Sequence, residues 1–173
     1  MKKLLVVVDY QVDFVTGSLG FKESELLDEK IAEKIEEYHR NNDDVAFTFD
    51  THDSTYLSTQ EGKNLPIVHC VKGTEGHELY GKVKFAKKEC DLIFEKTSFA
   101  SRKLYDYLLT HPYSQIELCG VVSDICVISN VVVCKLAQEE TPIKVDSSLV
   151  ASSSKIKKDS SIEIMKSLQV EVI

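Results

Sequence analysis

Short apolar runs alternate along the chain with amphipathic stretches. The first run, residues 3–9 (KLLVVVD), is almost wholly apolar and rich in β-branched residues, which is typical of a strand buried on both faces. A helical stretch is predicted from a cap at Ser24 to about Arg40. Its apolar positions lie on one stripe, which consists of Leu27, Ile31, Ile35 and Tyr38. A buried strand followed by an amphipathic helix indicates the beginning of an α/β fold.

The same alternation continues to the last residue. Further strands are predicted at residues 44–49, 92–94, 115–120, 142–145 and 170–173. Further helices are predicted at residues 101–109 and 123–138, capped by Ser101 and Ser123, and at residues 155–168, after a loop and cap at residues 152–154. Residues 51–90 contain scattered glycines and a proline and are predicted to be irregular, which for so long a segment indicates function. The pattern predicts one domain over residues 1–173, a Rossmann-like, three-layer α/β/α sandwich with a mainly parallel, six-stranded sheet.

Composition excludes several classes of partner. The formal net charge of −7 disfavours a nucleic-acid surface, which needs a basic patch. No apolar run approaches the roughly 20 residues of a membrane span, and the first residues do not resemble a signal peptide. The 5 cysteines show no metal-ligand or disulfide spacing, which indicates a reducing compartment. We therefore expect a cytoplasmic protein whose partner is a small molecule, with no nucleic acid and no membrane.

Polar residues follow the predicted strands at the points where they end. These residues are Asp9, Asp50 with His52, Glu95 with Lys96, and the segment 121–126. In parallel α/β sheets, ligands bind beyond the carboxyl ends of the strands. We therefore expect one edge of the sheet to carry an acid, a ligand cluster, a lysine and a cysteine.

Asp50, His52 and His69 lie within one short stretch of the chain. The first two stand two residues apart at a strand end, so their side chains point the same way. One carboxylate and two imidazoles form a ligand set that suits Zn²⁺, Mn²⁺ or Fe²⁺. The same residues also occur together as solvated loop residues, and their spacing alone leaves both interpretations open.

Cys126 is predicted to lie in the first turn of a helix that follows a strand and a turn. The positive end of the helix is expected to lower the pKa of the thiol, and free N–H groups there can bind an oxyanion. The alternative is a buried cysteine on an apolar helix face.

Asp9 is a candidate general base, and the alternative is a hydrogen-bond acceptor in a loop. Lys96 either holds the Asp9 carboxylate in place or is merely solvated.

The chain resembles the nicotinamidase/pyrazinamidase branch of the isochorismatase-like cysteine hydrolases from its first strand to its last. The similar segments occur in family order at family-like spacing: 9–15 (DYQVDFV), 50–52 (DTH), 66–70 (PIVHC) with 73–74 (GT), 96–99 (KTSF) and 120–127 (GVVSDICV). The resemblance implies conversion of nicotinamide to nicotinate and ammonia through a cysteine thioester. It thereby implies a role in NAD salvage and pyridine nucleotide biosynthesis. Relatives commonly associate, so a homo-oligomer is compatible with the resemblance, although the sequence does not decide the oligomeric state.

Site residues follow from the resemblance. It implies a catalytic triad of Asp9, Lys96 and Cys126, together with a cis peptide bond between Val121 and Val122. The N–H groups of Val122 and Cys126 would bind the oxyanion. One divalent metal ion, with zinc preferred over manganese or iron, would be held by Asp50, His52 and His69. Glu61 is the candidate for a fourth ligand. Phe14 is a candidate for a wall that stacks on the substrate ring, and the alternative is an aromatic residue of the core.

Some positions depart from the family pattern. Val12 stands where Asn is common, Thr51 and Asp53 replace a frequent Trp and Pro, and the chain contains no Trp. These departures concern the substrate pocket, so the alternative function is hydrolysis of another small amide or carbamoyl compound. Isochorismate ether hydrolysis is disfavoured because those relatives lack the nucleophilic cysteine.

Two other classes are weaker alternatives. A redox sensor would use Cys126 with Cys119 and Cys134, but it needs neither Asp9 nor Lys96. An iron oxygenase built on the three metal ligands fits the α/β pattern poorly and leaves the cysteine unexplained.

Overall fold

A central sheet organises the chain, which a computed structural model describes over residues 1–173. The sheet has 6 strands in the order β3-β2-β1-β4-β5-β6, and every neighbouring pair is parallel. The predicted fold class is thereby confirmed. The strands are β1 (Leu4–Val8), β2 (Asp44–Asp50), β3 (Leu92–Lys96), β4 (Ile116–Val121), β5 (Ile143–Ala151) and β6 (Glu171–Val172).

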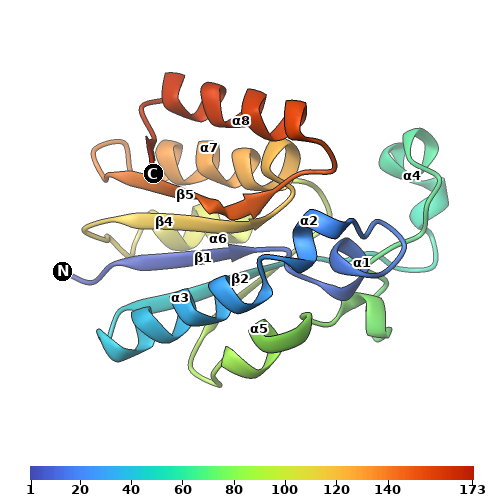
Figure 1. The fold of residues 1–173 in the computed structure, drawn as a ribbon, viewed down its shortest axis with the longest axis horizontal. Coiled ribbons are helices and arrows are strands. Elements are labelled where there is room, and N and C mark those ends of the chain that lie inside the picture. The colour runs from blue at the N-terminus through green and yellow to red at the C-terminus, as the bar shows by residue number, and fades with distance from the viewer.

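Helices cover both faces of the sheet (Figure 1). One face carries α1 (Val12–Val15), α2 (Lys22–Glu25), α3 (Asp28–Arg40) and α5 (Gly81–Ala86). The other carries α6 (Arg102–Leu108), α7 (Ile128–Ala137) and α8 (Lys155–Ser167). None of the helices has the length and apolar character that a membrane crossing needs.

Strand β1 supplies side chains to two separate cores because its residues alternate between the faces of the sheet. Leu5 and Val7 belong to the core under α3, while Leu4, Val6 and Val8 belong to the core under α6 and α7. All five are fully buried, as the apolar run predicted. Burial of each of these side chains stabilises the fold by about 1.5–3 kcal/mol. Strand β1 is therefore the central strand around which both layers form.

The predicted irregular segment at residues 51–90 is wrong in part, because short helices interrupt it. Besides α5 it contains α4 (Gln60–Asn64) and the 3₁₀ turns η1 (Tyr56–Ser58) and η2 (Glu75–His77). Helix α4 stands away from the layers beside the sheet edge (Figure 1). Its N-cap is Thr59, whose hydroxyl accepts a hydrogen bond from Gly62 N. Helices of four to six residues bury too few side chains to show a periodic pattern.

Two of the predicted serine caps are confirmed: the Ser101 hydroxyl accepts from Leu104 N, and the Ser154 hydroxyl accepts from Lys157 N at the start of α8. Ser24 lies inside α2, where its hydroxyl donates to Phe21 O and Val15 O, and α3 begins only at Asp28. Ser123 begins the π-helical turn η3 (Ser123–Val127), and its hydroxyl accepts from Ser161. In both failures the hydroxyl has a partner outside the expected helix turn.

The strand order reverses between β1 and β4, which both lie at the centre of the sheet. Gly120 makes their close approach possible there. Its φ is +109°, and a Cβ would lie 2.1 Å from Val8 O. Such a reversal leaves a crevice beyond the carboxyl ends of the two strands. Asp9 follows β1 and Val122 follows β4, so both lie at this crevice.

Candidate active site

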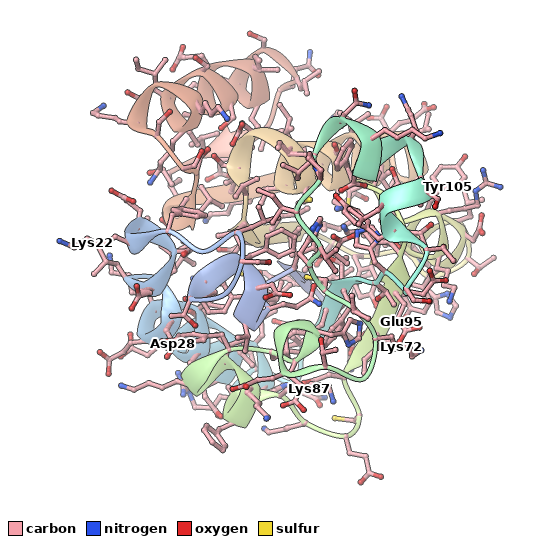
Figure 2. The ribbon with its side chains drawn as sticks, turned by 90° about the vertical axis from the view of Figure 1, so that its right-hand side faces the viewer. Lys22, Asp28, Lys72, Lys87, Glu95 and Tyr105 are labelled. Carbon is pink, nitrogen blue, oxygen red and sulfur yellow. The ribbon has the colours of Figure 1, made fainter.

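Four strand ends bring the predicted triad residues to one edge of the sheet, which Figure 2 views face on. Lys96 Nζ lies at the centre, 2.7 Å from Asp9 Oδ2, 3.8 Å from Cys126 Sγ and 3.4 Å from Asp50 Oδ1. All four residues are buried. One buried ammonium therefore faces two carboxylates and a thiol, as the strand-end rule predicted.

Asp9 is held by the backbone turn that ends β1. Its φ is +46°, in the left-handed region that costs most residues about 1 kcal/mol or more. The Thr48 hydroxyl donates to its Oδ1 at 2.6 Å. Its Oδ2 has Lys96 as ion-pair partner and accepts no further hydrogen bond. Oδ2 is therefore the oxygen that is free to take a proton from a neighbouring group.

Burial and charge oppose each other in setting the pKa values of this cluster. Burial raises the pKa of Asp9 above its usual range, although Lys96 opposes the shift. Burial lowers the pKa of Lys96, but the carboxylates of Asp9 and Asp50 and the thiol of Cys126 outweigh it, so that this pKa is raised. Lys96 therefore stays charged and compensates the buried carboxylates.

The expected lowering of the Cys126 pKa is wrong in direction. Burial, and then the charge of Asp9, raise the pKa of this thiol well above its usual value, although Lys96 opposes them. Its helix end consists of η3, a single π-helical turn in front of α7. Cys126 therefore rests as a thiol, and a reaction at its sulfur needs a base to remove the proton.

The turn between β4 and η3 shapes the space in front of the thiol. The peptide bond between Val121 and Val122 is cis, as the family resemblance implied. Val122 N–H donates no hydrogen bond within the protein, whereas its carbonyl accepts from Ile125 N and Val127 N. Val122 and Cys126 both line the same cavity. A free N–H beside a thiol is what an oxyanion site requires.

A second cluster adjoins the first through Asp50. Its Oδ2 lies 3.1 Å from His52 Nε2 and 3.2 Å from His69 Nε2. Glu61 Oε1, on α4, lies 4.0 Å and 3.7 Å from the same two nitrogens. One ligand atom from each residue lies within 4.8 Å of all the others. The structure thus brings together the four residues considered as metal ligands.

The donor atoms of this cluster fit a cation. His69 Nδ1 donates to Ile67 O at 2.7 Å, so a neutral imidazole directs the lone pair of Nε2 at Asp50 Oδ2. Two acceptors facing each other at this distance repel unless a proton or a metal ion lies between them. Accordingly, burial lowers the pKa of His69 but its bond to Asp50 outweighs this and raises it.

Tyr56 supports the two imidazoles from the side. Its ring centroid lies 4.6 Å from that of His52 and 4.9 Å from that of His69. Its hydroxyl donates to Leu65 O. Sequence reasoning missed Tyr56 because no local pattern marks a tyrosine in a loop as a wall for histidines.

Cys126 and Val122 open into one cavity of about 260 Å³, which is also lined by three of the four metal-ligand residues, Asp50, Glu61 and His69. Most of its other lining residues are apolar: Phe14, Leu19, Phe21, Leu65, Phe99 and Ile125. Phe14 is only 8% exposed and packs edge-on against His69, with ring centroids 5.5 Å apart. An apolar cavity with a few convergent polar groups is the usual form of a small-molecule site.

Two further buried contacts hold this site and were also missed. Asp13 Oδ2 accepts from Cys70 N at 2.7 Å, which fixes the segment that carries His69. Gln11 hydrogen-bonds the backbone of Asp50 through both atoms of its amide group. The signal for both was their place in the segment 9–15, which resembles the family, but nothing in that segment indicates their partners.

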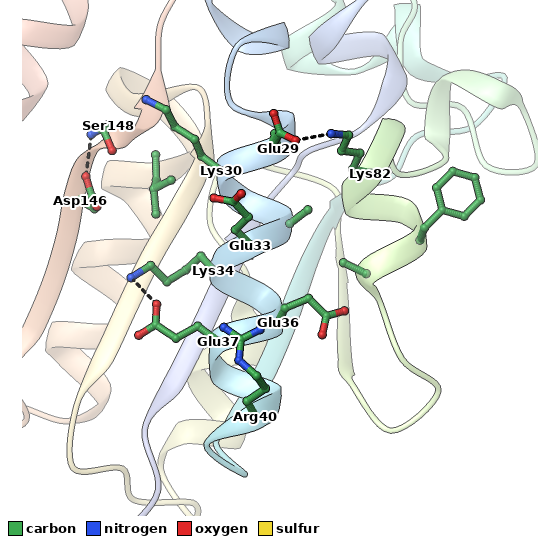
Figure 3. A pocket seen from close by; sticks show the side chains of 14 residues that line it. Glu29, Lys30, Glu33, Lys34, Glu36, Glu37, Arg40, Lys82, Asp146 and Ser148 are labelled. Carbon is green, nitrogen blue, oxygen red and sulfur yellow. Dashed lines mark hydrogen bonds and ion pairs between the residues drawn. The ribbon is translucent and has the colours of Figure 1, made fainter.

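A larger hollow of about 800 Å³ lies on the face covered by α3 and α5 (Figure 3). Its charged side chains pair with one another, as Lys34 does with Glu37 and Lys82 with Glu29. It contains no buried nucleophile, and exposed pairs of this kind are typical of a solvated surface. The chemistry therefore lies at the carboxyl edge of the sheet.

The chain is similar in sequence to proteins of one family. A family model described as the isochorismatase domain matches residues 3–173. The uncharacterized isochorismatase family protein PncA of Bacillus subtilis is 35% identical over 143 residues, which are 76% of this chain and 78% of that protein.

Two solved structures superpose over nearly the whole chain. The pyrazinamidase/nicotinamidase of Streptococcus mutans has a TM-score of 0.88 at 27% identity, covering 99% of this chain and 100% of its own. The pyrazinamidase of Pyrococcus horikoshii, solved in complex with zinc, has a TM-score of 0.87 at 22% identity, covering 100% and 99%. The latter likeness supports the fold.

Proposed function

Since this chain belongs to the isochorismatase family, we propose that it is a metal-dependent amidase that converts nicotinamide to nicotinate and ammonia. One observation carries the proposal. The Cys126 thiol, beside the Asp9–Lys96 ion pair, shares a cavity with three of four converging metal-ligand residues. An amide bound by its ring at the ligand cluster would present its carbonyl carbon to the thiol.

Asp9 acts as the base in the proposed mechanism. Oδ2 takes the proton of Cys126, and the sulfur attacks the carboxamide carbon. The N–H groups of Val122 and Cys126 bind the oxyanion that forms. The C–N bond then breaks, and ammonia leaves with the proton returned by Asp9, which leaves a thioester on the sulfur.

Hydrolysis of the thioester repeats the same proton transfers. Asp9 takes a proton from a water molecule, whose oxygen attacks the thioester carbon. The C–S bond breaks, nicotinate is released and the proton returns to the sulfur of Cys126. Lys96 stays protonated throughout and compensates the negative charge of the cluster, as the raised pKa of its ammonium indicates.

Asp50, His52, Glu61 and His69 would hold the metal ion. When bound, a divalent ion supplies a Lewis acid that orients the ring nitrogen of the substrate. Zinc suits two imidazoles and two carboxylates, and zinc is present in the structure of the Pyrococcus relative. Manganese and iron remain alternatives because the same ligands serve them.

The apolar wall supports an aromatic substrate. Phe14 reaches the cavity beside His69, where it can pack on the ring of a bound pyridine. The Streptococcus relative carries the name of a nicotinamidase. Nicotinate release would place the protein in NAD salvage and pyridine nucleotide biosynthesis.

The test is ammonia release from nicotinamide by the purified protein, with Cys126→Ala and a chelated sample measured alongside. We expect release by the metal-loaded protein and loss of release in both controls. No release by the metal-loaded protein would reject nicotinamide, and the same assay would then be run with other small amides and carbamoyl compounds. Activity that survives chelation would reject the metal requirement.

A further inference from the structure

Gln11 is a fully buried polar side chain that the proposed mechanism does not use. Its Nε2 donates to Asp50 O and to His77 O, both at 2.9 Å. Its Oε1 accepts from Asp50 N at 2.8 Å. The orientation of the amide is unambiguous, because a flipped amide would place its NH₂ group against Asp50 N–H. Both donors and the acceptor of Gln11 are thus bonded to backbone.

These bonds are formed where the backbone pairing between β1 and β2 ends. Strand β1 pairs with β2 as far as Val8 and Thr48, and Asp9 N then donates to Thr48 O. A continued parallel ladder would next join Asp50 N to Asp9 O and Gln11 N to Asp50 O. Instead, the left-handed turn at Asp9 directs Gln11 N onto Asp9 O at 2.8 Å.

The turn that presents Asp9 therefore leaves both backbone groups of Asp50 without partners from the β1 backbone. The side-chain amide of Gln11 takes both, in the place of the missing peptide unit. The other N–H of this amide donates to His77 O, in the segment that follows His69. The Gln11 amide therefore joins three segments of the chain, those of Gln11, Asp50 and His77.

The backbone orientation of Asp50 determines where both oxygens of its carboxylate lie. Its Oδ2 lies between two imidazole nitrogens and its Oδ1 faces Lys96. A small rotation of its backbone would move the carboxylate away from both groups. We propose that Gln11 is a positioning residue, which holds Asp50 in the orientation that binds the metal ion and contacts Lys96.

This inference rests on the proposed metal site, and zinc affinity tests it without an activity assay. Gln11→Met keeps the length of the side chain and removes all three hydrogen bonds. We expect its zinc dissociation constant, measured by competition with a chromophoric chelator, to rise by about tenfold or more, as for other partners of metal ligands. An affinity within about twofold of wild type would overturn the inference.

Tyr38→Phe is the matched control. It removes the buried hydrogen bond from the Tyr38 hydroxyl to Glu117 Oε2, at 2.7 Å, near the opposite end of the sheet. We expect it to lower the melting temperature while zinc affinity stays within about twofold of wild type. If both variants lose stability and zinc affinity alike, the role of Gln11 is merely structural and the inference fails.

The wild-type protein gives a second measurement if Gln11→Met does not fold. In ¹⁵N-labelled protein titrated with zinc, we expect the side-chain NH₂ of Gln11 and the amide of Asp50 to shift together and to exchange more slowly. An unchanged Gln11 signal while Asp50 responds would overturn the inference. Wild-type protein that binds no more zinc than His69→Ala would instead reject the proposed metal site itself.

Discussion

Asp50 Oδ1 lies 3.4 Å from Lys96 Nζ, so the carboxylate at the centre of the ligand cluster also contacts the lysine of the proposed triad. Its other oxygen lies between His52 and His69. The bonds to these imidazoles outweigh burial and lower the pKa of Asp50. The two halves of the site therefore share one ionised carboxylate, and changes in one half are expected to reach the other.

Lys96→Met should reduce kcat/KM by about 10²-fold or more, the usual scale for loss of acid–base function. Without the ammonium, the pKa of the Asp9 carboxyl rises further, because Lys96 is the main group that lowers it. A larger fraction of Asp9 would then be protonated at a given pH and unable to act as a base. The measurement is kcat/KM against pH, in which the acidic limb of the variant should move to higher pH.

Lys72→Met is the control for this variant. Lys72 forms an exposed ion pair with Glu95, 2.7 Å away, at the same edge of the molecule (Figure 2). Exposed pairs contribute about 0–1 kcal/mol, so this change should leave both activity and the pH profile near those of wild type. An equal loss in both variants would contradict a specific role for Lys96.

The wild-type pH profile should show an acidic limb set by Asp9. Burial raises the pKa of this carboxyl above its ordinary value of about 3.9, and the base works only when ionised. Activity should therefore fall as the pH drops through a midpoint above about 4.

The pKa of the Cys126 thiol determines how kcat/KM is expected to change at alkaline pH. Burial raises the pKa of its thiol, so no rise in kcat/KM is expected at the ordinary cysteine value of about 8.5. Initial rates from about pH 4 to about pH 10 at constant ionic strength test both limbs. A rise that follows an inflection near 8.5 would indicate attack by a freely ionised thiolate instead.

Zinc should stabilise the folded protein. Binding to the native state alone adds about 2.7 kcal/mol when the free metal is at 100 times its dissociation constant. For a domain of this size that is a rise of about 5–10 °C in melting temperature. Thermal unfolding of chelated and zinc-loaded protein measures the shift. His69→Ala should abolish it, and a shift that persists in this variant would place the bound zinc elsewhere.

Phe14→Leu should raise KM more than it lowers kcat. The ring centroid of Phe14 lies 5.5 Å from that of His69 and the side chain lines the cavity, so we expect it to contact the ring of the substrate and not the reacting carbon. Aromatic pairs contribute about 0.5–1.5 kcal/mol, which corresponds to a KM about 2- to 12-fold higher. Steady-state kinetics on nicotinamide measure the split between KM and kcat.

Phe94→Leu serves as the comparison for Phe14→Leu. Phe94 is 7% exposed, close to the 8% of Phe14, and belongs to the core on the other face of the sheet. Phe94→Leu should lower the free energy of unfolding about as much as Phe14→Leu does, without a change in KM. A KM that rises equally in both variants would show that Phe14 acts only through packing.

Much of the site could be predicted from residues that end strands. The run from Lys3 to Asp9 has the pattern of a strand buried on both faces, and Asp9 follows directly from where that run stops. Family resemblance added Glu61, which the structure places 3.7 Å from His69. By contrast, Gln11 could not be assigned because its partner Asp50 lies in another segment, and Tyr56 could not because no local pattern marks a loop tyrosine as a wall for histidines.

The sequence by itself determined the order of the strands and of the longer helices, and with it the sheet edge that carries the chemistry. These features depend on the alternation of neighbouring side chains, which a local pattern records. Only the tertiary structure decided the direction of the Cys126 pKa and the partners of Gln11. Burial and charge at Cys126 come from residues far along the chain, among them Asp9 and Lys96, and Gln11 bonds a residue 39 positions away. Folding creates these contacts, so no pattern of adjacent residues contains them.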